Sequence, residues 1–563
     1  MQPLTKSWLL HPVITPQVEQ ALFTYPPILR QLLFNREIET SEAAIRYLQA
    51  QPPPGTEPQN LLCMSEAVER IQSAIKNLEN IAIYGDYDAD GVTATALLVS
   101  ALQRAGADVI GYIPNRFDEG YGLNIEALSS LQDQGVKLVI TVDCGMRSVE
   151  EAAHARRIGL DLIITDHHHP SDEIPPALAI INAKQPGDTY PDKNLAGVGL
   201  AYKLATAIYE DPALTAEHLD LVALGTVADL APLVGENRAL VRLGLEQIRK
   251  PRRQGLMALI GAAGLRPDRI NAGDIGYTLG PRLNAAGRLE SALAALELLL
   301  SQDVYVAASL AQKLDAQNRE RQQITREIQV QAEQLALAEN PDALLLFASD
   351  PGFNPGVVGL AASRLTEVYY RPAIVASQGE QTTRGSCRSI PEFHITDALD
   401  RCADLLVRHG GHAAAAGFTV RNENLPELKQ RLQELAEQQL GGMHLRPVLH
   451  ADLQLPLSEL KPELLTYIEA LQPTGYSNRQ AHFISRDLKV MSYRQIGKEG
   501  KHLRLVVSDG RITYDAVAFN QGYWVDAMPA NIDIYYSYEV NEYNGRSSLQ
   551  LNVRDLKPAG SDD

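Results

Sequence analysis

The chain has 563 residues, of which 51 are basic and 69 acidic, so its formal net charge is −18. At about 150 residues per domain, this length predicts three or four domains. Its 45% hydrophobic and 21% charged residues are ordinary globular values, which exclude a mainly disordered or fibrous chain. The acidic balance argues against a uniformly basic nucleic-acid-binding surface, although a local basic groove or bound divalent cations can reverse it.

Signals for secretion and membrane insertion are weak. No stretch approaches the roughly 18–20 apolar residues that a membrane span needs. The N-terminus carries one Lys and a short apolar patch broken by His11 and Pro12, which is a poor match to a signal peptide. The four cysteines are scattered without a C-x-x-C pair, which argues against a structural zinc site or a disulfide framework. We therefore expect a cytoplasmic protein.

The first half of the chain predicts an α/β domain. Residues 1–60 form an N-terminal preface that ends in the breaker-rich run 51–55. Residues 61–300 are predicted to form one domain. From about 65 to 185 short apolar strands alternate with amphipathic helices, which predicts crossover connections and a parallel sheet, and a more helical stretch follows from about 195 to 300. The expected strands are Asn80–Gly85, Asp108–Ile113, Val136–Val142 and Leu160–Thr165, and the helices between them include Thr93–Ala105 and Ser148–Ile158.

The second half predicts three further parts. Residues 301–342 are polar with apolar side chains on roughly one face, as in a connecting helix. Residues 343–445 form a second, smaller α/β domain. Residues 446–558 carry short alternating strands typical of a small β-barrel, at His502–Val507, Tyr514–Phe519, Ile532–Val540 and Ser548–Val553.

The strongest local feature is Asp86-Tyr87-Asp88-Ala89-Asp90-Gly91, directly after an apolar strand and before a helix. Alternate residues of an extended segment share a face, so these carboxylates can converge on one hard cation. A calcium loop of the EF-hand type also begins this way, but it needs a Glu at the twelfth position, where this chain has Leu97. One or two of these Asp residues could instead only cap the following helix.

Further acidic and imidazole side chains follow other strands. Asp143 ends one strand, and Asp166-His167-His168 ends the next. Because ligands bind outside the carboxyl ends of parallel strands, these clusters and Asp86–Asp90 are expected at one edge of the sheet. Asp229 is a fourth candidate, since an acid within an apolar segment needs a partner such as a metal, although it could also be a cap or turn residue.

This set of ligands predicts phosphoester or phosphoanhydride hydrolysis. Carboxylates with one or two imidazoles suit Mn²⁺ or Mg²⁺, and four or more acidic ligands suggest two ions. Two such ions activate a water and neutralise charge at phosphorus. The sequence has neither the G-x-x-x-x-G-K-S/T nucleotide loop nor the H-E-x-x-H zinc motif.

Several motifs together resemble one family. Asp166-His167-His168 with the D-x-D-A-D-G strand end is similar to the DHH phosphoesterase superfamily, and 410–418 (GGHAAAAGF) is similar to the signature of its associated substrate-binding domain, DHHA1. Within that superfamily the chain resembles the RecJ family of single-stranded-DNA-specific exonucleases. The motifs that carry this resemblance are 84–93, 120–124 (GYGLN), 281–288 (PRLNAAGR) and 355–365 (PGVVGLAASRL).

The resemblance implies a fold and a set of residue roles. It implies a DHH domain, a DHHA1 domain and a C-terminal OB-fold. The implied metal ligands are Asp88, Asp90, Asp143, His167 and Asp229, with Asp86 and His168 as catalytic support. The implied nucleic-acid contacts are Arg282, Asn284, Arg288, Arg388, Ser389, Gly411 and His412, although each Arg could instead form only a surface or interdomain ion pair.

The C-terminal segment favours nucleic-acid binding, because single-strand-binding barrels combine basic side chains with aromatic platforms. Its basic residues are interleaved with Tyr493 and followed by Tyr535, Tyr536 and Tyr538, although these tyrosines could equally be barrel packing. The basic residues are Lys489, Arg494, Lys498, Lys501 and Arg504.

Three functions remain in view. The first is a divalent-metal exonuclease for single-stranded DNA in recombination and repair; its 5′→3′ direction comes from the resemblance alone. The second is a non-catalytic strand-binding scaffold on the same fold, which would be expected to lose acidic ligands. The third is a phosphoesterase for short oligonucleotides, whose relatives lack the barrel. By analogy we expect a monomer that works with a single-strand-binding protein and a helicase.

Overall fold

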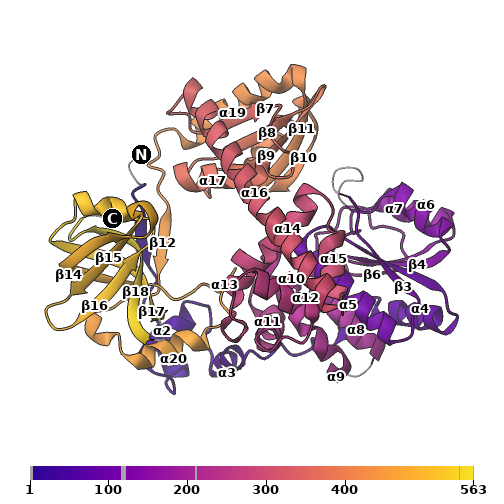
Figure 1. Cartoon of the computed structure of the whole chain (residues 1–563), viewed down its shortest axis with the longest axis horizontal. Coiled ribbons are helices and arrows are strands. Elements are labelled where there is room, and N and C mark those ends of the chain that lie inside the picture. The colour runs from indigo at the N-terminus through magenta and orange to yellow at the C-terminus, as the bar shows by residue number, and fades with distance from the viewer. Residues whose placement is uncertain (1–3, 116–121, 210–211, 544–545, 562–563) are drawn as a thin grey trace. The chain divides into compact units, whose positions relative to one another are not determined.

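The computed structural model describes residues 4–115, 122–209, 212–543 and 546–561 (Figure 1). Part of the 120–124 motif, Gly120 and Tyr121, lies outside these residues. The chain divides into two compact units, which are described separately: His11–Asn318 with Asp452–Gly560, and Arg319–Ala451 with the N-terminal strand β1 (Ser7–Leu10). None of the described helices is both long enough and apolar enough to cross a membrane.

The larger unit contains the predicted parallel sheet, in the order β3-β2-β4-β5-β6. These strands are β2 (Asn80–Gly85), β3 (Val109–Tyr112), β4 (Val136–Val142), β5 (Asp161–Thr165) and β6 (Ala179–Ile181), of which the sequence did not predict β6. All four neighbouring pairs are parallel. The predicted sheet is thus confirmed and extended by one short strand.

Both faces of this sheet are covered, as a parallel sheet requires. On β4, Leu138, Ile140 and Val142 belong to one core cluster and Val139 to another. Figure 1 shows helices of the first cluster below the sheet and helices of the second above it. The first set is α4 (Met64–Lys76), α5 (Ala89–Arg104) and α8 (Gly197–Tyr209), and the second is α6 (Ile125–Asp133) and α7 (Val149–Arg157).

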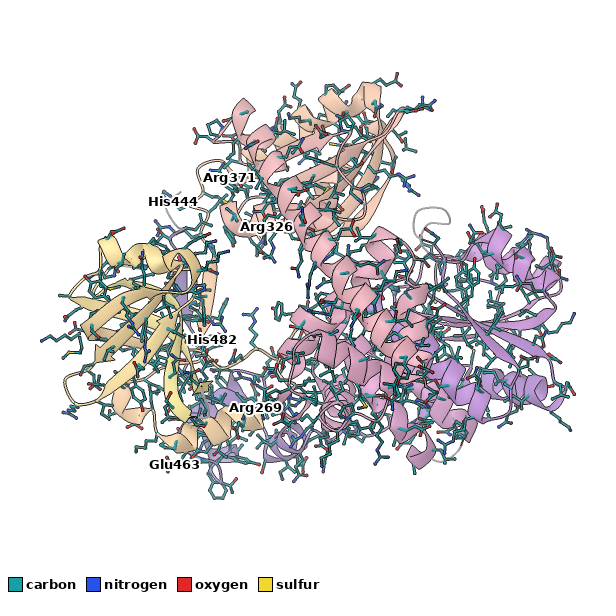
Figure 2. The ribbon with its side chains drawn as sticks, viewed as in Figure 1. Arg269, Arg326, Arg371, His444, Glu463 and His482 are labelled. Atoms are coloured by element: carbon teal, nitrogen blue, oxygen red, sulfur yellow. The ribbon has the colours of Figure 1, made fainter. Side chains whose placement is uncertain are left out.

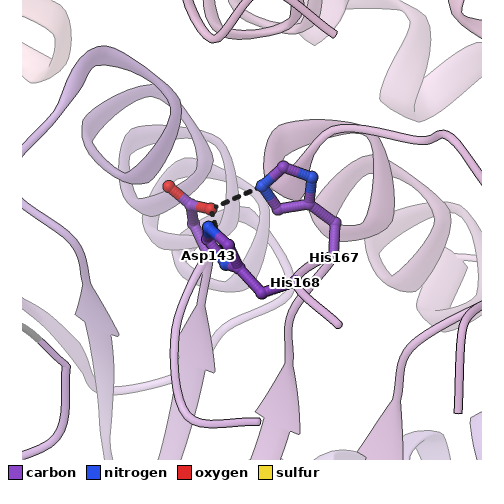
Figure 3. Close-up of side chains that lie close together, drawn as sticks. All are labelled: Asp143, His167 and His168. Carbon is purple, nitrogen blue, oxygen red and sulfur yellow. Dashed lines mark ion pairs between the residues drawn. The ribbon is translucent and has the colours of Figure 1, made fainter. Parts of the chain in front are cut away.

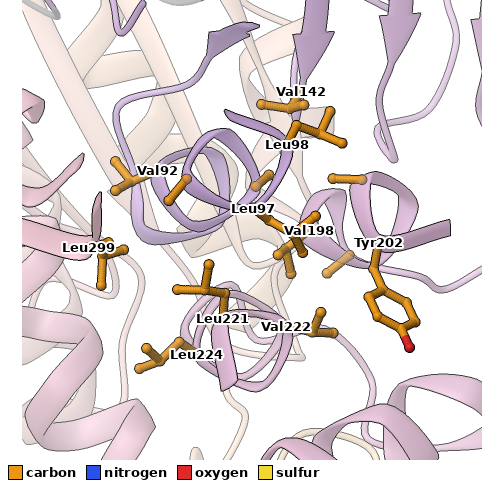
Figure 4. Close-up of a cluster of buried hydrophobic side chains, with 14 of the residues drawn as sticks. Val92, Leu97, Leu98, Val142, Val198, Tyr202, Leu221, Val222, Leu224 and Leu299 are labelled. Carbon is orange, nitrogen blue, oxygen red and sulfur yellow. The ribbon is translucent and has the colours of Figure 1, made fainter. Parts of the chain in front are cut away.

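The first cluster continues into a helical layer. Figure 4 shows Leu97 and Leu98 of α5 packed with Val198 of α8 and Leu221 of α10 (Leu219–Ala228). Burying side chains of this size stabilises the fold by about 1.5–3 kcal/mol each. Further helices of the larger unit are α9 (Pro212–Thr215), α11 (Gly235–Ile248), α12 (Gln254–Ala262), α13 (Ala272–Asp274), a π-helical turn (Ile275–Leu279), α14 (Gly280–Leu289), α15 (Leu293–Leu300) and α20 (Pro462–Ala470). The predicted connecting helix is α16 (Val304–Glu339), which begins in the larger unit and continues into the smaller one.

The C-terminal barrel is a closed five-strand sheet with OB-like topology. Its strands are β14 (Phe483–Ile496), β15 (His502–Ser508), β16 (Thr513–Ala518), β17 (Asn531–Tyr543) and β18 (Arg546–Pro558). The sheet order is β13-β14-β15-β16-β18-β17, in which the two-residue strand β13 (Leu453–Gln454) pairs in parallel with β14, and β17 pairs with β14 to close the barrel. Tyr535, Tyr536 and Tyr538 are buried on β17, so the structure supports barrel packing, the second of the two predicted alternatives, for all three. His482, labelled in Figure 2, stacks on Tyr535 with ring centroids 5.0 Å apart.

The N-terminal preface packs on this barrel. Its helices are α1 (Pro16–Ala21), α2 (Pro27–Phe34) and α3 (Ser41–Gln49). Leu32 of α2 is part of the barrel core. Just beyond α2, the Arg36 guanidinium lies 3.0 Å from an Asp452 carboxylate oxygen, and both side chains are largely buried.

Arg238 of α11 connects the N-terminal preface and the segment before the barrel with the helical layer of the larger unit. Its guanidinium is buried and donates hydrogen bonds to the carbonyl oxygens of Tyr47, Ala470, Leu471 and Pro473. It also lies over the Tyr47 ring, 4.0 Å from the centroid. A single buried cation thus links three segments that are far apart in the sequence.

The smaller unit is the second α/β domain. Its mixed sheet has the order β10-β11-β9-β8-β7, in which only β7 and β8 are parallel. The strands are β7 (Leu346–Asp350), β8 (Ala373–Gln378), β9 (Thr382–Arg388), β10 (Leu406–His412) and β11 (Ala415–Arg421). The helices are α17 (Val358–Tyr369), α18 (Ile395–Asp400) and α19 (Leu425–Leu440). The strand β1 pairs in parallel with β12 (Val448–Ala451).

Candidate metal centre

The five predicted metal ligands and the two predicted catalytic residues converge at the carboxyl edge of the parallel sheet. They form three overlapping groups whose ligand atoms lie within 4.8 Å of one another. The groups are Asp143 with His167 and His168, Asp90 with His167 and Asp229, and Asp86 with Asp88 and Asp143. Because Asp143 and His167 are each shared by two groups, the arrangement suits more than one cation.

The first acidic loop is shaped by the start of α5. Asp88 is its N-cap, and one carboxylate oxygen accepts hydrogen bonds from the N–H groups of Asp90 and Gly91. The helix-cap reading is therefore correct for Asp88, but it accounts for one carboxylate of three. Asp90 is fully buried, and its two oxygens accept hydrogen bonds from the Gly197 and Val198 N–H groups at the start of α8.

The clearest evidence for a cation site comes from Asp143 and His167 (Figure 3). Asp143 Oδ1 and His167 Nε2 are buried and 3.0 Å apart, yet neither has a hydrogen-bond partner in the described part of the chain. Asp229 Oδ2 and Asp90 Oδ2 lie 3.7 Å and 3.9 Å from the same nitrogen. Buried polar atoms are normally satisfied, so these side chains fit a shared hard divalent cation.

The backbone is strained where it presents Asp143. This residue has φ of 61°, in the left-handed region that non-glycine residues rarely adopt. Gly197 packs so closely that an added Cβ would lie 2.7 Å from the Asp143 Cβ. Strain of this kind persists only where the surrounding structure enforces it, and it is concentrated at functional sites.

Without a cation the centre is electrostatically unfavourable. Burial, followed by the charges of Asp90 and Asp88, raises the pKa of Asp143 well above its usual value. Burial and then the charge of Asp88 raise the pKa of Asp90 to about 7, and burial with the charge of Asp90 raises the pKa of Asp229 to about 9. Burial, with the charge of His168, lowers the pKa of His167 to about 3, so this imidazole is neutral and able to bind a metal.

Asp166 is a functional residue that the sequence reasoning did not select. Its Oδ1 accepts hydrogen bonds from the His168 N–H and from His168 Nδ1, at 3.0 and 2.7 Å, and its Oδ2 accepts one from the Met146 N–H. Burial opposes ionisation of Asp166, but the His168 hydrogen bond and charge outweigh it and lower its pKa. The same contact raises the pKa of His168 against the effect of burial. The sequence feature that could have identified Asp166 is its position in Asp166-His167-His168, directly after a buried strand.

In the larger unit, the predicted nucleic-acid contacts Asn284 and Arg282 have partners within the protein. Asn284 Oδ1 accepts a hydrogen bond from the Ala89 N–H at 2.7 Å, so it supports the acidic loop. Arg282 pairs with Asp315 at 2.9 Å and donates to the Thr278 carbonyl, as in the ion-pair alternative. Arg288, on the last turn of α14, is half-buried.

The other four lie together in the smaller unit. Arg388 and His412 are at the ends of β9 and β10, and both stand opposite Ala415 of β11. Gly411 has φ of 153° and stands opposite Ala416, where an added Cβ would lie 2.4 Å from backbone atoms. Ser389 follows β9 and donates its hydroxyl to the Phe393 carbonyl. The structure therefore groups these four residues at one end of the sheet.

Comparison with known proteins agrees with this geometry. The model of the DHH family N-terminal domain matches residues 80–226, that of the DHHA1 domain 341–438, and that of the RecJ OB domain 451–555. The fold and the carboxylate–histidine centre thus define a DHH-type protein.

Whole-chain relatives are more specific. The single-stranded-DNA-specific exonuclease RecJ of Bacillus subtilis is 40% identical over 94% of this chain and 68% of its own length. The protein of the same name from Escherichia coli is 35% identical over 95% of this chain and 96% of its own. The crystal structure of Thermus thermophilus RecJ with Mn²⁺ matches 99% of this chain and 80% of its own, at 30% identity and a TM-score of 0.85. The chain belongs to the RecJ family. A structure of the Thermus protein with Mg²⁺ also matches, with a TM-score of 0.79.

Proposed function

We propose that this protein is a divalent-metal-dependent exonuclease that hydrolyses phosphodiester bonds of single-stranded DNA. The observation that carries this proposal is the set of overlapping ligand groups around Asp143 and His167, in which the buried Asp143 Oδ1 and His167 Nε2 have no hydrogen-bond partner among the described residues. The names of the relatives support the substrate, and the Mn²⁺ and Mg²⁺ in related structures support either ion as the cofactor.

We assign the metal-binding role to Asp86, Asp88, Asp90, Asp143, His167 and Asp229. When bound, two such ions would supply a nucleophilic water and neutralise charge on the phosphate. The protein itself holds the neutral His167 imidazole and the strained Asp143 in place, and it keeps other hydrogen-bond donors away from their ligand atoms. The carboxylates Asp90 and Asp88 are fixed by backbone N–H groups, so little reorganisation is needed on binding.

His168 is assigned to proton transfer or to contact with the scissile phosphate. Asp166 fixes its Nδ1 at 2.7 Å, which leaves Nε2 as the atom that can face substrate. Its side chain is 41% exposed, against 13% for His167. Because the Asp166 carboxylate favours the cation, His168 can donate a proton or a charge-assisted hydrogen bond to an anionic substrate.

We assign binding of the DNA strand to residues in three regions of the protein. Arg388, Ser389, Gly411 and His412 would bind phosphates in the smaller unit, and Arg282, Asn284 and Arg288 would shape the catalytic unit. On the barrel, Arg494 of β14 stands opposite Arg504 of β15, and the His502 and Phe519 rings lie edge to face at 5.2 Å. The aromatic side chains that this region exposes include Tyr493, Phe519 and Tyr523, at 45%, 49% and 44%, and these replace the buried tyrosines of β17 as stacking platforms.

The proposal has further parts. The enzyme would cleave from the 5′ end and act in recombination and repair, together with a single-strand-binding protein and a helicase. It would be a monomer in the cytoplasm. The retained ligands argue against a non-catalytic scaffold, and the barrel argues against a phosphoesterase for short oligonucleotides.

The test uses a long single strand labelled separately at each end, with Mn²⁺ or EDTA, and compares the wild type with Asp143→Ala. We expect metal-dependent loss of the 5′ label that the substitution abolishes. Loss of the 3′ label first would refute the polarity. Binding without cleavage in either metal would favour the scaffold, and cleavage of short oligonucleotides alone would favour the third function.

A further inference from the structure

The segment Asn182-Ala183-Lys184 lies beside the Asp166-His167-His168 turn. It directly follows β6, which is parallel to β5 with Ile181 opposite Thr165. Asn182 therefore leaves its strand where Asp166 leaves the neighbouring one. The Asp166 N–H donates to the Ile181 carbonyl at 3.2 Å, so the two strand ends are joined at this point.

Both histidine backbones are held from this segment. Asn182 is fully buried; its Nδ2 donates to the His168 carbonyl at 2.9 Å, and its Oδ1 accepts from the Lys184 N–H at 2.8 Å. The Lys184 ammonium donates to the His167 carbonyl at 2.5 Å. Asn182 thus fixes one histidine directly and orients the lysine that fixes the other.

We propose that Asn182 and Lys184 are positioning residues that set the affinity of the centre for its divalent cations. This inference rests on the proposed function, because it takes His167 as a metal ligand. Neither side chain belongs to the three ligand groups. Groups that orient ligands typically change metal affinity or activity by about 10–100-fold when they are removed.

The contacts explain why both residues are needed. The turn carries two side chains with different nearest partners. His167 Nε2 lies 3.0 Å from Asp143, with Asp90 and Asp229 beyond it, whereas His168 Nδ1 lies 2.7 Å from Asp166 and 3.9 Å from Asp143. Within the described part of the chain, the Asp166 side chain accepts hydrogen bonds from His168 and from the Met146 backbone, and from no group of His167. The His167 peptide is restrained through Lys184, and a charge-assisted hydrogen bond of this kind is stronger than a neutral one.

The experiment measures Mn²⁺ binding to the full chain without DNA, by calorimetry, for Asn182→Ala, Lys184→Met and Lys184→Arg. The matched control is Gln185→Ala. Gln185 is also buried and follows the same strand, but its Nε2 donates to the Ile180 carbonyl and not to the histidine turn. Circular dichroism and thermal denaturation of each metal-free variant report whether it is folded.

For Asn182→Ala and Lys184→Met we expect a Mn²⁺ dissociation constant about 10–100-fold above that of the wild type. We expect Lys184→Arg to restore most of the affinity and Gln185→Ala to bind as the wild type does. Saturating Mn²⁺ should return the kcat of Asn182→Ala on single-stranded DNA towards the wild-type value, whereas Asp143→Ala should stay inactive.

Folded Asn182→Ala and Lys184→Met proteins with wild-type Mn²⁺ affinity would overturn the inference. An equal loss of affinity in Gln185→Ala would also overturn it, because the effect would then be one of general packing. If Asn182→Ala does not fold, the half-buried Lys184 still decides the question. A wild-type protein that binds no Mn²⁺ would instead refute the proposed function.

Discussion

Binding of Mn²⁺ at the carboxylate–histidine centre is expected to release protons at neutral pH. The pKa of Asp229 is raised to about 9 by burial and by the charge of Asp90, and the pKa of Asp90 is raised to about 7 by burial and by Asp88. At pH 7 the metal-free centre therefore holds a proton on Asp229 and about half a proton on Asp90. A cation needs ionised carboxylates, so it must displace these protons.

The size of the effect follows from the number of protons. Each proton released makes the Mn²⁺ dissociation constant fall about tenfold per pH unit. Release from Asp229 alone predicts about a 100-fold fall between pH 6 and pH 8, and Asp90 adds to it near pH 6. The stability of the metal-free protein falls with rising pH, whereas its affinity for Mn²⁺ rises. Its raised carboxyl pKa values mean that the folded state binds more protons, so stability falls as the pH rises from about 4 through these values.

Calorimetric titration with Mn²⁺ at pH 6, 7 and 8, in buffers of different ionisation enthalpy, counts the protons. Thermal denaturation in EDTA over the same range follows the metal-free stability. The control is Asp229→Asn, which should release about one proton fewer and flatten the decline in stability. A dissociation constant that is independent of pH, with one binding enthalpy in all buffers, would refute the reasoning.

Three further predictions concern packing and strand binding. Gly197→Ala should weaken Mn²⁺ binding and destabilise the fold by about 1–3 kcal/mol, because the added Cβ would lie 2.7 Å from the Asp143 Cβ. The control is Gly199→Ala on the same helix, where the atom nearest to the added Cβ is a Leu195 side-chain carbon. This variant should bind Mn²⁺ normally in the same titration. Arg238→Met should lower the denaturation midpoint, with a loss of about 3–5 kcal/mol, because it removes four charge-assisted hydrogen bonds to carbonyl oxygens in a largely buried site. Arg242→Met, which removes a hydrogen bond to the Leu48 carbonyl alone among the described contacts, should cost less, and equal midpoints for the two variants would contradict this account. Phe519→Ala should weaken single-stranded DNA binding by about 1–3 kcal/mol in a fluorescence titration, whereas the exposed Phe23→Ala should not; equal affinities would remove Phe519 from the binding surface.

The metal centre could be predicted because its ligands follow predictable strands. The structure gives β2 and β4 the bounds that the sequence predicts and β5 one residue fewer, and parallel strands deliver whatever follows them to one edge. Asp229 was harder to predict, since it ends α10, a helix that is buried and mostly apolar apart from Asp220 and Thr226, and the pattern of this helix carries no sign of the partners of Asp229.

What the sequence could not predict depends on contacts between distant segments. The side chain of Asn35 donates to Asp452 across 417 positions, so no local pattern could reveal that the N-terminal preface packs on the barrel. The strand β6 has three residues, too few for a periodic signal, and so the role of Asn182 after it was not visible. Tyr536 and Tyr538 are two residues apart and belong to the barrel core, as strand alternation allows, whereas Tyr535 is buried with the His482 ring stacked on it, a contact across about 50 positions that no local pattern reveals.

The most direct test of the central claim is an anomalous difference map from crystals of this protein grown with Mn²⁺. We expect a peak within bonding distance of both Asp143 Oδ1 and His167 Nε2, and a second peak that shares Asp143 or His167 with the other ligands. Fully occupied Mn²⁺ elsewhere, with Asp143 and His167 left unligated, would contradict the assignment of this centre as the site of phosphodiester hydrolysis.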